Sequence, residues 1–482
     1  MDLSRSEIFV RADGSPQIGL GHVVRCMALS LMLKNEFEIT FYYREMPDSM
    51  VKEISDGGFG VVKIEHEEQF FEKLYKKVVV VLDGYGFDDG YQHKIKIKGA
   101  KLVCIDDLHN NLFLADLIIN HAPGITPQAY KTKPYTQFAL GLDFALLRPA
   151  FLEQAKNQRE IVKIETVLVC FGGSDSRNLT ERTLQVVLRF QQFIKIYVVT
   201  GSAFVPGDEL GRLLDSDPRI EHRQALTEQK MLETMLDSDL AIVPSSGILF
   251  EALASGCLVV SGNYVDNQKL VYENFRDSGC FTDAGNFEIP ELTKAINEVI
   301  NGHTKNPVFI DGNSATRVIR LFDQLNKETF ITVRKAKVTD LDITFGWASS
   351  AEIRRYAFQQ HQISKSEHTN WFLNKLAEAN CRFYIIEYKN EPIGSIRFDI
   401  REGEAKISYL LDPLFHGQGF GQLILKKGIE QLLNEVEPDH LTIHLVSGDV
   451  MTTNVPSIKA FERLGFIRKM VSENFKFEKL VI

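Results

Sequence analysis

The sequence predicts a protein of the α/β class, with two doubly wound parallel sheets followed by a smaller C-terminal domain of the α+β class. Apolar strand-like runs alternate with helical stretches from the N-terminus to about residue 300. Several runs, such as residues 78–82, contain only Val and Leu, which suits strands that are covered on both faces. After Lys327 the rhythm of the pattern changes, and the length of 482 residues exceeds what one core usually organises. We therefore expect two or three domains.

The first two thirds of the chain contain a series of βαβ units. Strands are expected, in chain order, at residues 8–11, 39–43, 60–63, 78–82, 101–105, 117–119, 166–171, 195–200, 240–243 and 259–261. The pattern restarts near Glu165, after a polar segment at 153–160. The restart predicts two Rossmann-like halves, residues 1–152 and 153–328, with a ligand-binding cleft between them.

The last third, residues 329–482, is predicted to be a separate domain. A helix at 313–326 closes the second half, and a new unit begins at Ile331. Further strands are expected at residues 383–387, 392–400 and 405–411. A short turn at 389–392 joins the first two of these strands, which makes an antiparallel arrangement the expected one.

The composition indicates a soluble globular protein, since 44% of the residues are hydrophobic and 25% are charged. A formal net charge of −9 argues against a general nucleic-acid binder. The chain has no run of 18 apolar residues and begins without a signal-like segment, so we expect neither a membrane nor a secreted location. The six cysteines form no C-x-x-C pair, which favours buried free thiols in a reducing compartment. The cytoplasm is the expected location.

The most informative stretch is RADGSPQIGLGHVVR at residues 11–25, between the first strand and a helix expected at 23–33. Gly19 and Gly21 let a ligand approach the backbone, and the free N–H groups of a helix start attract anions. His22 stands at that helix start, where the positive helix end favours a neutral imidazole that can accept a proton. The alternative is an ordinary structural turn with a capping histidine. Arg25 replaces the third glycine of G-x-G-x-x-G, so a dinucleotide motif is a poor match.

Two further turns follow strands in the second half. Their residues are Gly172, Gly173 and Ser174 in the first turn, and Ser245, Ser246 and Gly247 in the second. The first turn exposes backbone N–H groups but is of a common structural type, whereas the second suits a diphosphate at a helix start. Glu251, one helical turn further, could accept hydrogen bonds from a ribose, or could be a buried glutamate stabilised by the helix dipole. Asn267 and Gln268 would border the same cleft.

These motifs resemble those of the GT-B-like nucleotide-sugar enzymes. Within them the likeness is to the UDP-2,4-diacetamido-2,4,6-trideoxy-β-L-altropyranose hydrolases of pseudaminic acid synthesis, and also to a spore-coat polysaccharide protein. It covers residues 7–320 and includes Asp83-Gly-Tyr85, Ile105-Asp106-Asp107 and Asn267-Gln268. The resemblance implies hydrolysis at the anomeric carbon, with release of UDP and the free diacetamido sugar.

The same resemblance implies roles for individual residues. His22 would orient or activate the attacking water, while Tyr85 and Asn267 would position the sugar or the water. Contacts with the substrate or UDP are implied for Asp13, Gly19, Gly21, Arg25, Gly172, Gly173, Ser174, Ser245, Ser246, Gly247, Glu251 and Gln268. Helix N-termini would stabilise the departing UDP, and no metal is expected. Asp106 and Asp107 could bind a metal but are interpreted as loop residues, as are His109 and His121.

In the last third, YLLDPLFHGQGFG at residues 409–421 resembles the acetyl-CoA loop of GNAT N-acetyltransferases, and NVPSIKAFERLGF at 454–466 resembles the family's other signature. The resemblance implies acetyl-CoA as the co-substrate. The residues that would hold it are Leu410, Leu411, His416, Gly417, Gln418, Gly419, Phe420, Gly421, Asn454, Ser457 and Phe461. His416 replaces the usual Gln or Arg, and Phe461 stands where many members carry a Tyr that protonates the thiolate. The source of that proton stays open.

The acceptor side of this domain is less informative. The surroundings of Trp347 and Arg354, and the segment from Ser366 to Trp371, resemble the sugar-amine acetyltransferase of the same pathway and, more distantly, ribosomal-protein acetyltransferases. Glu367 or His368 could serve a substrate amine, although surface-helix positions are the expected interpretation.

Together the motifs predict a bifunctional enzyme that acetylates a UDP-linked amino sugar and hydrolyses the UDP-linked diacetamido product. Its partners would be the UDP-amino sugar and acetyl-CoA, with no nucleic acid and no membrane; its oligomeric state is unknown. The alternatives are a glycosyltransferase that uses the same UDP cleft, and a UDP-sugar-binding scaffold fused to an acetyltransferase whose acceptors are peptide N-termini.

Overall fold

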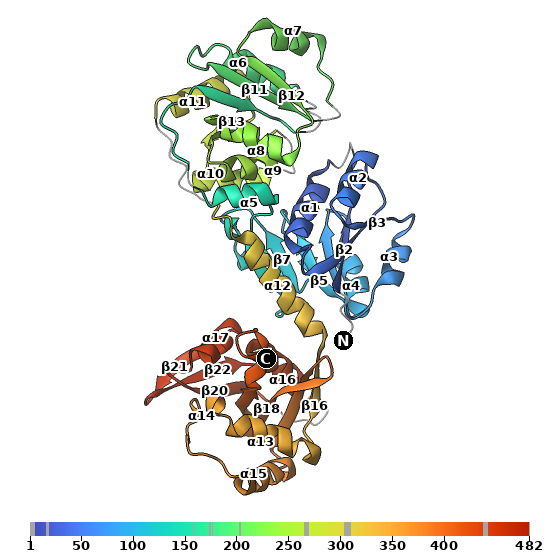
Figure 1. Ribbon diagram of the computed structural model, residues 1–482, viewed down its shortest axis with the longest axis vertical. Helices are drawn as coiled ribbons and strands as arrows, with labels where there is room; N and C mark the ends of the chain where they lie inside the picture. Colours follow the sequence, from blue (N-terminus) through green and yellow to red (C-terminus); the bar gives the residue numbers. More distant parts are fainter. Residues whose placement is uncertain are drawn as a thin grey trace. The chain divides into compact units, whose positions relative to one another are not determined.

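The computed structural model describes residues 5–15, 19–157, 159–172, 175, 177–201, 204–264, 269–302, 310–436 and 442–481. The chain forms two compact units, Met1–Asn326 and Lys327–Ile482 (Figure 1). No helix in the described ranges is both long and apolar enough to cross a membrane.

The first sheet of the N-terminal unit is wholly parallel and has seven strands. Its spatial order is β3 (Gly60–Lys63), β2 (Phe37–Tyr43), β1 (Ser6–Ala12), β4 (Val79–Asp83), β5 (Lys101–Ile105), β7 (Leu117–Asn120) and β9 (Gln137–Leu140). The helices between the first strands are α1 (Gly21–Leu33), α2 (Asp48–Asp56), α3 (Glu67–Lys73) and α4 (Asp89–Ile97). The strand order reverses between β1 and β4, which is where ligands bind in doubly wound sheets.

The second sheet of the same unit repeats this topology with six parallel strands. Its order is β12 (Ile220–Gln224), β11 (Lys195–Thr200), β10 (Thr166–Val169), β13 (Leu240–Pro244), β14 (Leu258–Gly262) and β15 (Thr282–Asp283). Its helices include α6 (Leu179–Val187), α7 (Asp208–Ser216), α8 (Glu228–Leu236), α9 (Gly247–Ala254), α10 (Lys269–Ser278) and α11 (Ile289–Ile300). The order reverses between β10 and β13.

Two helices tie the halves of this unit together. Helix α5 (Pro149–Ala155) packs against α8 and α9, and the Ala150 N–H donates to Glu228 Oε1 at 2.7 Å. From α12 (Ser314–Thr329), Phe322 meets Phe37 of β2 with ring centroids 6.3 Å apart. One buried apolar cluster consequently runs from the strands of the first sheet to the helices of the second half.

The C-terminal unit contains a seven-stranded sheet that is antiparallel except for one neighbouring pair. The order is β16 (Ile331–Lys335), β17 (Cys381–Tyr388), β18 (Glu391–Arg401), β19 (Glu404–Leu411), β20 (Leu445–Met451), β22 (Asn474–Leu480) and β21 (Ile467–Val471). Strands β19 and β20 are parallel and pair only as far as Ile407 and Gly448, so their continuations separate. The main helices are α13 (Leu341–Ser349), α14 (Ala351–Arg354), α15 (Lys365–Ala377), α16 (Phe420–Val436) and α17 (Val455–Arg463).

The structure confirms the predicted fold class, with parallel sheets in the N-terminal unit and a mixed, mainly antiparallel sheet in the C-terminal unit. The sequence did not predict β9, β12 and β15 of the parallel sheets, the short strands β6 (Leu112–Phe113) and β8 (Lys131–Thr132), or β20, β21 and β22 of the C-terminal sheet. Strand β12 reads Ile-Glu-His-Arg-Gln and has no apolar run to indicate it. The strand expected at 166–171 ends at Val169, and the chain turns at Gly172, where φ is +82°. All six cysteines are buried and free.

Candidate functional site

Polar side chains follow the carboxyl ends of neighbouring strands in the first sheet. Asp13 comes directly after β1, Asp83 ends β4, Asp107 follows β5 and His121 follows β7. Because parallel strands end at one edge of their sheet, these side chains are brought to the same edge, next to the start of α1.

Asp83 is the centre of this edge and is completely buried. Its Oδ1 lies 2.7 Å from His22 Nδ1 and 2.7 Å from Arg25 Nη2, and its Oδ2 accepts from Arg25 Nε at 3.0 Å. Burial by itself raises the pKa of Asp83, but Arg25 and His22 outweigh burial and hold the pKa below its ordinary value. The carboxylate therefore stays charged and can only accept hydrogen bonds.

The tautomer of His22 follows from this contact. A 2.7 Å approach to an acceptor-only carboxylate requires the hydrogen on Nδ1, and in the neutral ring this leaves the lone pair on Nε2. The Arg25 Nη2 group also lies 3.1 Å from Nδ1, but Nδ1 has no lone pair free to accept it in this tautomer. His22 thus presents Nε2 as a proton acceptor, and Asp83 fixes the orientation of the ring.

The local backbone explains why His22 stands there. Gly19 has φ +85° and its N–H donates to Ser15 O at 2.7 Å, which closes the turn before α1. Helix α1 then begins at Gly21, so His22 lies in its first turn, as the sequence predicts. The ring of Tyr85 meets the His22 ring edge-on, with centroids 4.6 Å apart.

Arg25 connects His22 and Asp83 to a second carboxylate. Its Nη1 donates to Asp107 Oδ2 at 2.9 Å, and the Tyr85 hydroxyl lies 3.4 Å from the same oxygen. The sequence interpretation of Asp107 as a loop residue is therefore incomplete, because the side chain reaches the His22 site. Asp106 does act within its loop, where it accepts from the His109 N–H at 2.7 Å.

Asp13, which was predicted to contact substrate, is engaged within the protein. Its Oδ1 accepts from the N–H groups of Arg44 at 2.7 Å and Glu45 at 3.2 Å. Its Oδ2 pairs with the buried guanidinium of Arg11 at 2.8 Å, and Glu67 holds the same guanidinium from another side. In this structure Asp13 supports the turn that follows β1.

His121 lies in a loop, as expected, but it is buried and connects the two halves of the N-terminal unit. Its ring stacks on Phe250 of α9 with centroids 4.0 Å apart, and Nδ1 accepts from the Leu146 N–H at 3.2 Å. Burial, followed by the nearby Arg25, lowers the pKa of His121 to about 3, so the ring is neutral and carries its hydrogen on Nε2.

In the second half, α9 begins directly after β13 and presents an open N-terminus. Ser246 occupies the N-cap position without a side-chain hydrogen bond to the described residues, and Gly247 is exposed. The first turn of α9 contains no acidic residue, so its N–H groups can face an anion. Ser245 instead is fully buried, and its hydroxyl lies 3.0 Å from that of Ser261, which ties β13 to β14.

Glu251 was predicted to accept from a ribose or to be a buried glutamate. The structure shows it buried and paired with Arg148, whose Nε and Nη2 donate to its two oxygens at 2.8 and 2.9 Å. Burial raises the pKa of Glu251 to about 7, against the opposing effect of Arg148. Contact with a ribose stays a prediction.

Asp175 follows the glycine turn after β10. Asp175 accepts from the N–H groups of Leu179 and Thr180, each at 2.8 Å, so its carboxylate occupies the start of α6. An anion would compete with Asp175 for those N–H groups. Gly173, Ser174, Asn267 and Gln268 lie outside the described residues, and their predicted roles are untested.

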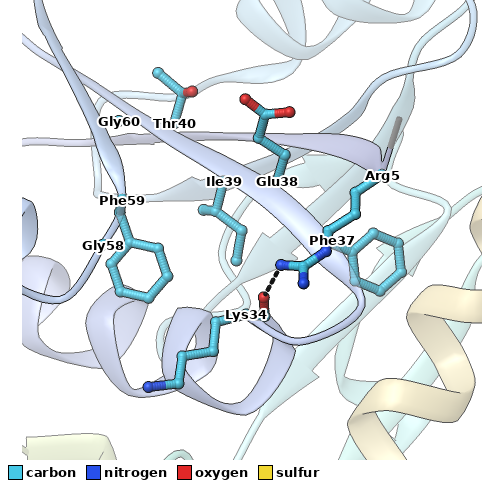
Figure 2. Close-up of a pocket in the computed structure, with 9 residues that line it drawn as sticks. All are labelled: Arg5, Lys34, Phe37, Glu38, Ile39, Thr40, Gly58, Phe59 and Gly60. Atoms are coloured by element: carbon cyan, nitrogen blue, oxygen red, sulfur yellow. Dashed lines mark hydrogen bonds between the residues drawn. The ribbon is translucent and has the colours of Figure 1, made fainter. Parts of the chain in front are cut away.

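A hollow of about 270 Å³ lies elsewhere on the N-terminal unit (Figure 2). It is lined by the first residues of β2, including Phe37 and Glu38, and by Arg5, whose Nη1 donates to Lys34 O at 3.0 Å. This is the amino end of the strands, opposite to the edge that holds His22. Its geometry gives no reason to place chemistry there.

The C-terminal unit has a cradle for a phosphorylated cofactor where β19 and β20 separate. Gly417 and Gly419, in the loop before α16, have φ +76° and +85°, and these conformations favour glycine. The His416 Nε2 lies 3.0 Å from Leu411 O and the Gln418 amide donates to Leu414 O at 2.9 Å, so both side chains fold back onto the loop. Gly421 stands in the first turn of α16, after the buried Phe420. Backbone N–H groups of this loop and helix start can therefore hold a pyrophosphate.

The start of α17 lies beside this opening. Asn454 caps the helix by accepting from the Ser457 N–H at 3.2 Å, and the Ser457 hydroxyl lies 2.9 Å from that of Tyr409 on β19. Phe461 is buried and stacks on Phe477 with centroids 5.0 Å apart, while its contact with Tyr409 is edge-on. Leu410 and Leu411 end β19 beyond the last β19–β20 pair.

The predicted surface position of His368 is wrong. The side chain is buried among Phe345, Trp371 and Phe372, and its Nε2 lies 3.1 Å from Thr344 Oγ1. The sequence pattern indicated that His368 lies on a helix, but only tertiary packing decides which face of α15 is buried against the rest of the domain. Glu367 is exposed and closes a capping box with Ser364.

Among the described residues, one group of three acidic or thiol side chains lies close enough together for a metal: Glu378, Cys381 and Asp399. Lys375 Nζ already pairs with Glu378 at 2.7 Å and with Asp399 at 3.0 Å. The cluster is accounted for by this ion pairing.

The sequence did not identify Asp83 and Asp107 as site residues, although both stand in motifs that carry the resemblance, and Asp107 was interpreted as a loop residue. The signal that could have identified them is their position, since Asp83 is the last residue of β4 and Asp107 lies two residues after β5.

Comparisons with known proteins agree with two functional parts. Residues 331–467 match the sequence model of the acetyltransferase (GNAT) domain family. An uncharacterized protein of Methanocaldococcus jannaschii is 25% identical over an alignment of 495 positions, gaps included, and the alignment covers 95% of this chain and 96% of that protein. A spore coat polysaccharide biosynthesis protein of Bacillus subtilis is 28% identical over 293 residues, covering 58% of this chain and 85% of its own. The UDP-2,4-diacetamido-2,4,6-trideoxy-beta-L-altropyranose hydrolase of Campylobacter jejuni is 24% identical over 274 residues, covering 55% of this chain and 93% of its own.

Proposed function

We propose that this chain, which joins a part similar to a UDP-diacetamido-sugar hydrolase to a GNAT acetyltransferase domain, carries two enzyme activities. The N-terminal unit hydrolyses UDP-2,4-diacetamido-2,4,6-trideoxy-β-L-altropyranose to UDP and the free sugar. The C-terminal unit transfers the acetyl group of acetyl-CoA to the 4-amino group of a UDP-linked amino sugar. The two reactions would follow one another in pseudaminic acid-type synthesis.

The contact between His22 and the buried Asp83 carries the hydrolase proposal. In the proposed step a water oxygen attacks the anomeric carbon, and one water proton passes to His22 Nε2. The bond between the anomeric carbon and the phosphate oxygen breaks, and its electron pair leaves with UDP. Asp83 stabilises the imidazolium that forms, and the N-terminus of α9 stabilises the diphosphate.

His22 lies on the first half and α9 on the second, so the proposal requires the substrate to bridge them. His121 already links the two, because it follows β7 of the first sheet and stacks on Phe250 of α9. The proposal puts the sugar near His22 and the diphosphate at Ser246 and Gly247, and the contact between His121 and Phe250 supports it.

The test is incubation of the purified full-length chain with the UDP-diacetamido sugar and no acceptor. We expect equal amounts of UDP and free sugar, and His22→Ala should lower the rate by about 100- to 10,000-fold. His93→Ala, at an exposed histidine of α4, is the matched control. UDP release that requires an added acceptor alcohol would indicate a glycosyltransferase, and binding without UDP release would indicate a scaffold.

The acetyltransferase proposal is supported by the separated strands and the glycine loop of the C-terminal unit. When bound, acetyl-CoA supplies the activated acetyl group. The loop at Gly417 and Gly419 would hold its pyrophosphate, and the hydroxyl pair of Tyr409 and Ser457 is available to return a proton, since Phe461 has no hydroxyl. We expect CoA release with the UDP-4-amino sugar. Mass spectrometry that found acetylated peptide N-termini instead would refute a sugar acceptor.

A further inference from the structure

Asp107 is an unusual carboxylate because its two oxygens have very different surroundings. Oδ2 accepts from Arg25 Nη1 at 2.9 Å and faces the Tyr85 hydroxyl at 3.4 Å. Oδ1 is buried and has no hydrogen-bond partner among the described residues. A buried acceptor left without a donor is unfavourable, and more so when it is charged, so a carboxylate oxygen in this state requires an explanation.

The position of this oxygen connects it to the proposed chemistry. One guanidinium, that of Arg25, contacts His22, Asp83 and Asp107. Tyr85 lies against the His22 ring and reaches Asp107 with its hydroxyl. The oxygen without a partner therefore belongs to the same cluster that presents His22 Nε2 as a proton acceptor.

The electrostatics of the cluster fix the kind of group that can meet Asp107 Oδ1. The side chain is only 11% exposed and is paired with a cation, so it is an acceptor and not a donor. An anionic group such as a phosphate would be repelled, and an ether or carbonyl oxygen would offer no hydrogen. The partner must bring an N–H or O–H group.

We propose that Asp107 is a positioning residue of the hydrolase site, whose Oδ1 accepts a hydrogen bond from a donor in the reacting complex. This inference rests on the proposed hydrolase function. Two donors have the right chemistry: the attacking water, which has a second proton besides the one given to His22, and an acetamido N–H of the sugar. In either case Asp107 would fix the position of a reacting partner relative to Nε2.

The test exploits an isosteric change. In Asp107→Asn the amide oxygen can still accept the hydrogen bond from Arg25. The NH2 group then takes the position of Oδ1, so a hydrogen-bond donor replaces an acceptor there. We expect kcat/KM for the UDP-diacetamido sugar to fall about 100-fold or more. Asp106→Asn, at the adjacent carboxylate that serves its loop, is the matched control and should stay within threefold of the wild type.

Substrate analogues distinguish the two donors. UDP-sugars in which one or the other acetamido group is replaced by hydrogen remove a candidate N–H. If an acetamido N–H is the donor, Asp107→Asn and wild type become equal within threefold on one analogue. If the attacking water is the donor, the loss appears in kcat on every substrate, while KM is little changed.

The stability of each variant is measured in parallel by thermal unfolding. If Asp107→Asn does not fold, kcat/KM of Asp107→Glu is compared with that of the wild type instead. The glutamate keeps a charge for Arg25 but displaces the free oxygen. The inference is overturned if wild type hydrolyses the substrate and both folded variants retain kcat/KM within threefold. Absence of hydrolysis by the wild type would instead overturn the proposed function.

Discussion

Replacing Asp83 by asparagine tests whether a buried carboxylate orients His22 for catalysis. The change keeps the size of the side chain but removes its charge and turns one of its two acceptor oxygens into an NH2 group. Since those oxygens meet His22 Nδ1, Arg25 Nη2 and Arg25 Nε, at least one N–H must then face another N–H. Both activity and stability should suffer.

The expected losses of stability and of kcat follow from the burial of Asp83 and Arg25. Asp83 is completely buried and the Arg25 side chain is 12% exposed, so the variant leaves a largely buried guanidinium with Asp107 as its remaining carboxylate. Removing one partner of a buried ion pair typically costs about 3–5 kcal/mol. Because Arg25 keeps Asp107, we expect the lower part of that range. Loss of the correct His22 tautomer should lower kcat by about 1,000- to 10,000-fold.

The assay measures UDP release together with urea unfolding at neutral pH, so that the two effects are separated. Asp116→Asn is the control, since Asp116 is also buried and pairs with Lys101 at 3.0 Å, but precedes β7 at the amino edge of the sheet. It should lower stability and leave kcat unchanged.

A double-mutant cycle isolates the role of Asp83. If Asp83 acts through His22, the Asp83→Asn change should cost little further activity in a His22→Ala background. The reasoning would be refuted if the losses of activity from Asp83→Asn and His22→Ala were additive in the double variant. It would also be refuted if Asp83→Asn alone kept kcat within tenfold of the wild type.

Three further outcomes are expected. Because burial lowers the pKa of His121 to about 3, its contribution to folding is complete above its ordinary pKa of 6.5 and is lost as pH falls towards 3; between pH 8 and pH 5 the free energy of unfolding of His121→Asn should therefore fall by about 2 kcal/mol less than that of the wild type in urea titrations. Gly419→Ala places a side chain at φ +85° in the loop before α16, and should raise the KM for acetyl-CoA about tenfold in steady-state assays, without affecting UDP release. Phe461→Ala removes the ring that stacks on Phe477 and should destabilise the C-terminal unit by about 3–5 kcal/mol in urea unfolding; a loss below 1 kcal/mol would contradict the packing described.

Much of the fold could be predicted because it depends on local patterns. The continuous apolar runs identified β1, β4 and β5, and the change of rhythm after Lys327 indicated a different class of sheet. The polar strand β12 could not be found in this way, because its strand character comes from pairing with β11 and not from its own residues. The order of the strands also lies outside what periodicity encodes.

By itself the sequence determined the fold class and the place of His22 at the start of α1, since glycines and apolar periodicity act over a few residues. Only the tertiary structure decided what His22 contacts. Asp83 is 61 residues away along the chain, and it reaches Nδ1 because β1 and β4 are neighbours in the sheet. In the same way, only packing brought Arg148 to Glu251 and Asp107 to Arg25. Ionic and hydrogen-bonded contacts depend on distance in space, and sequence patterns carry that information only within a helix turn or a strand.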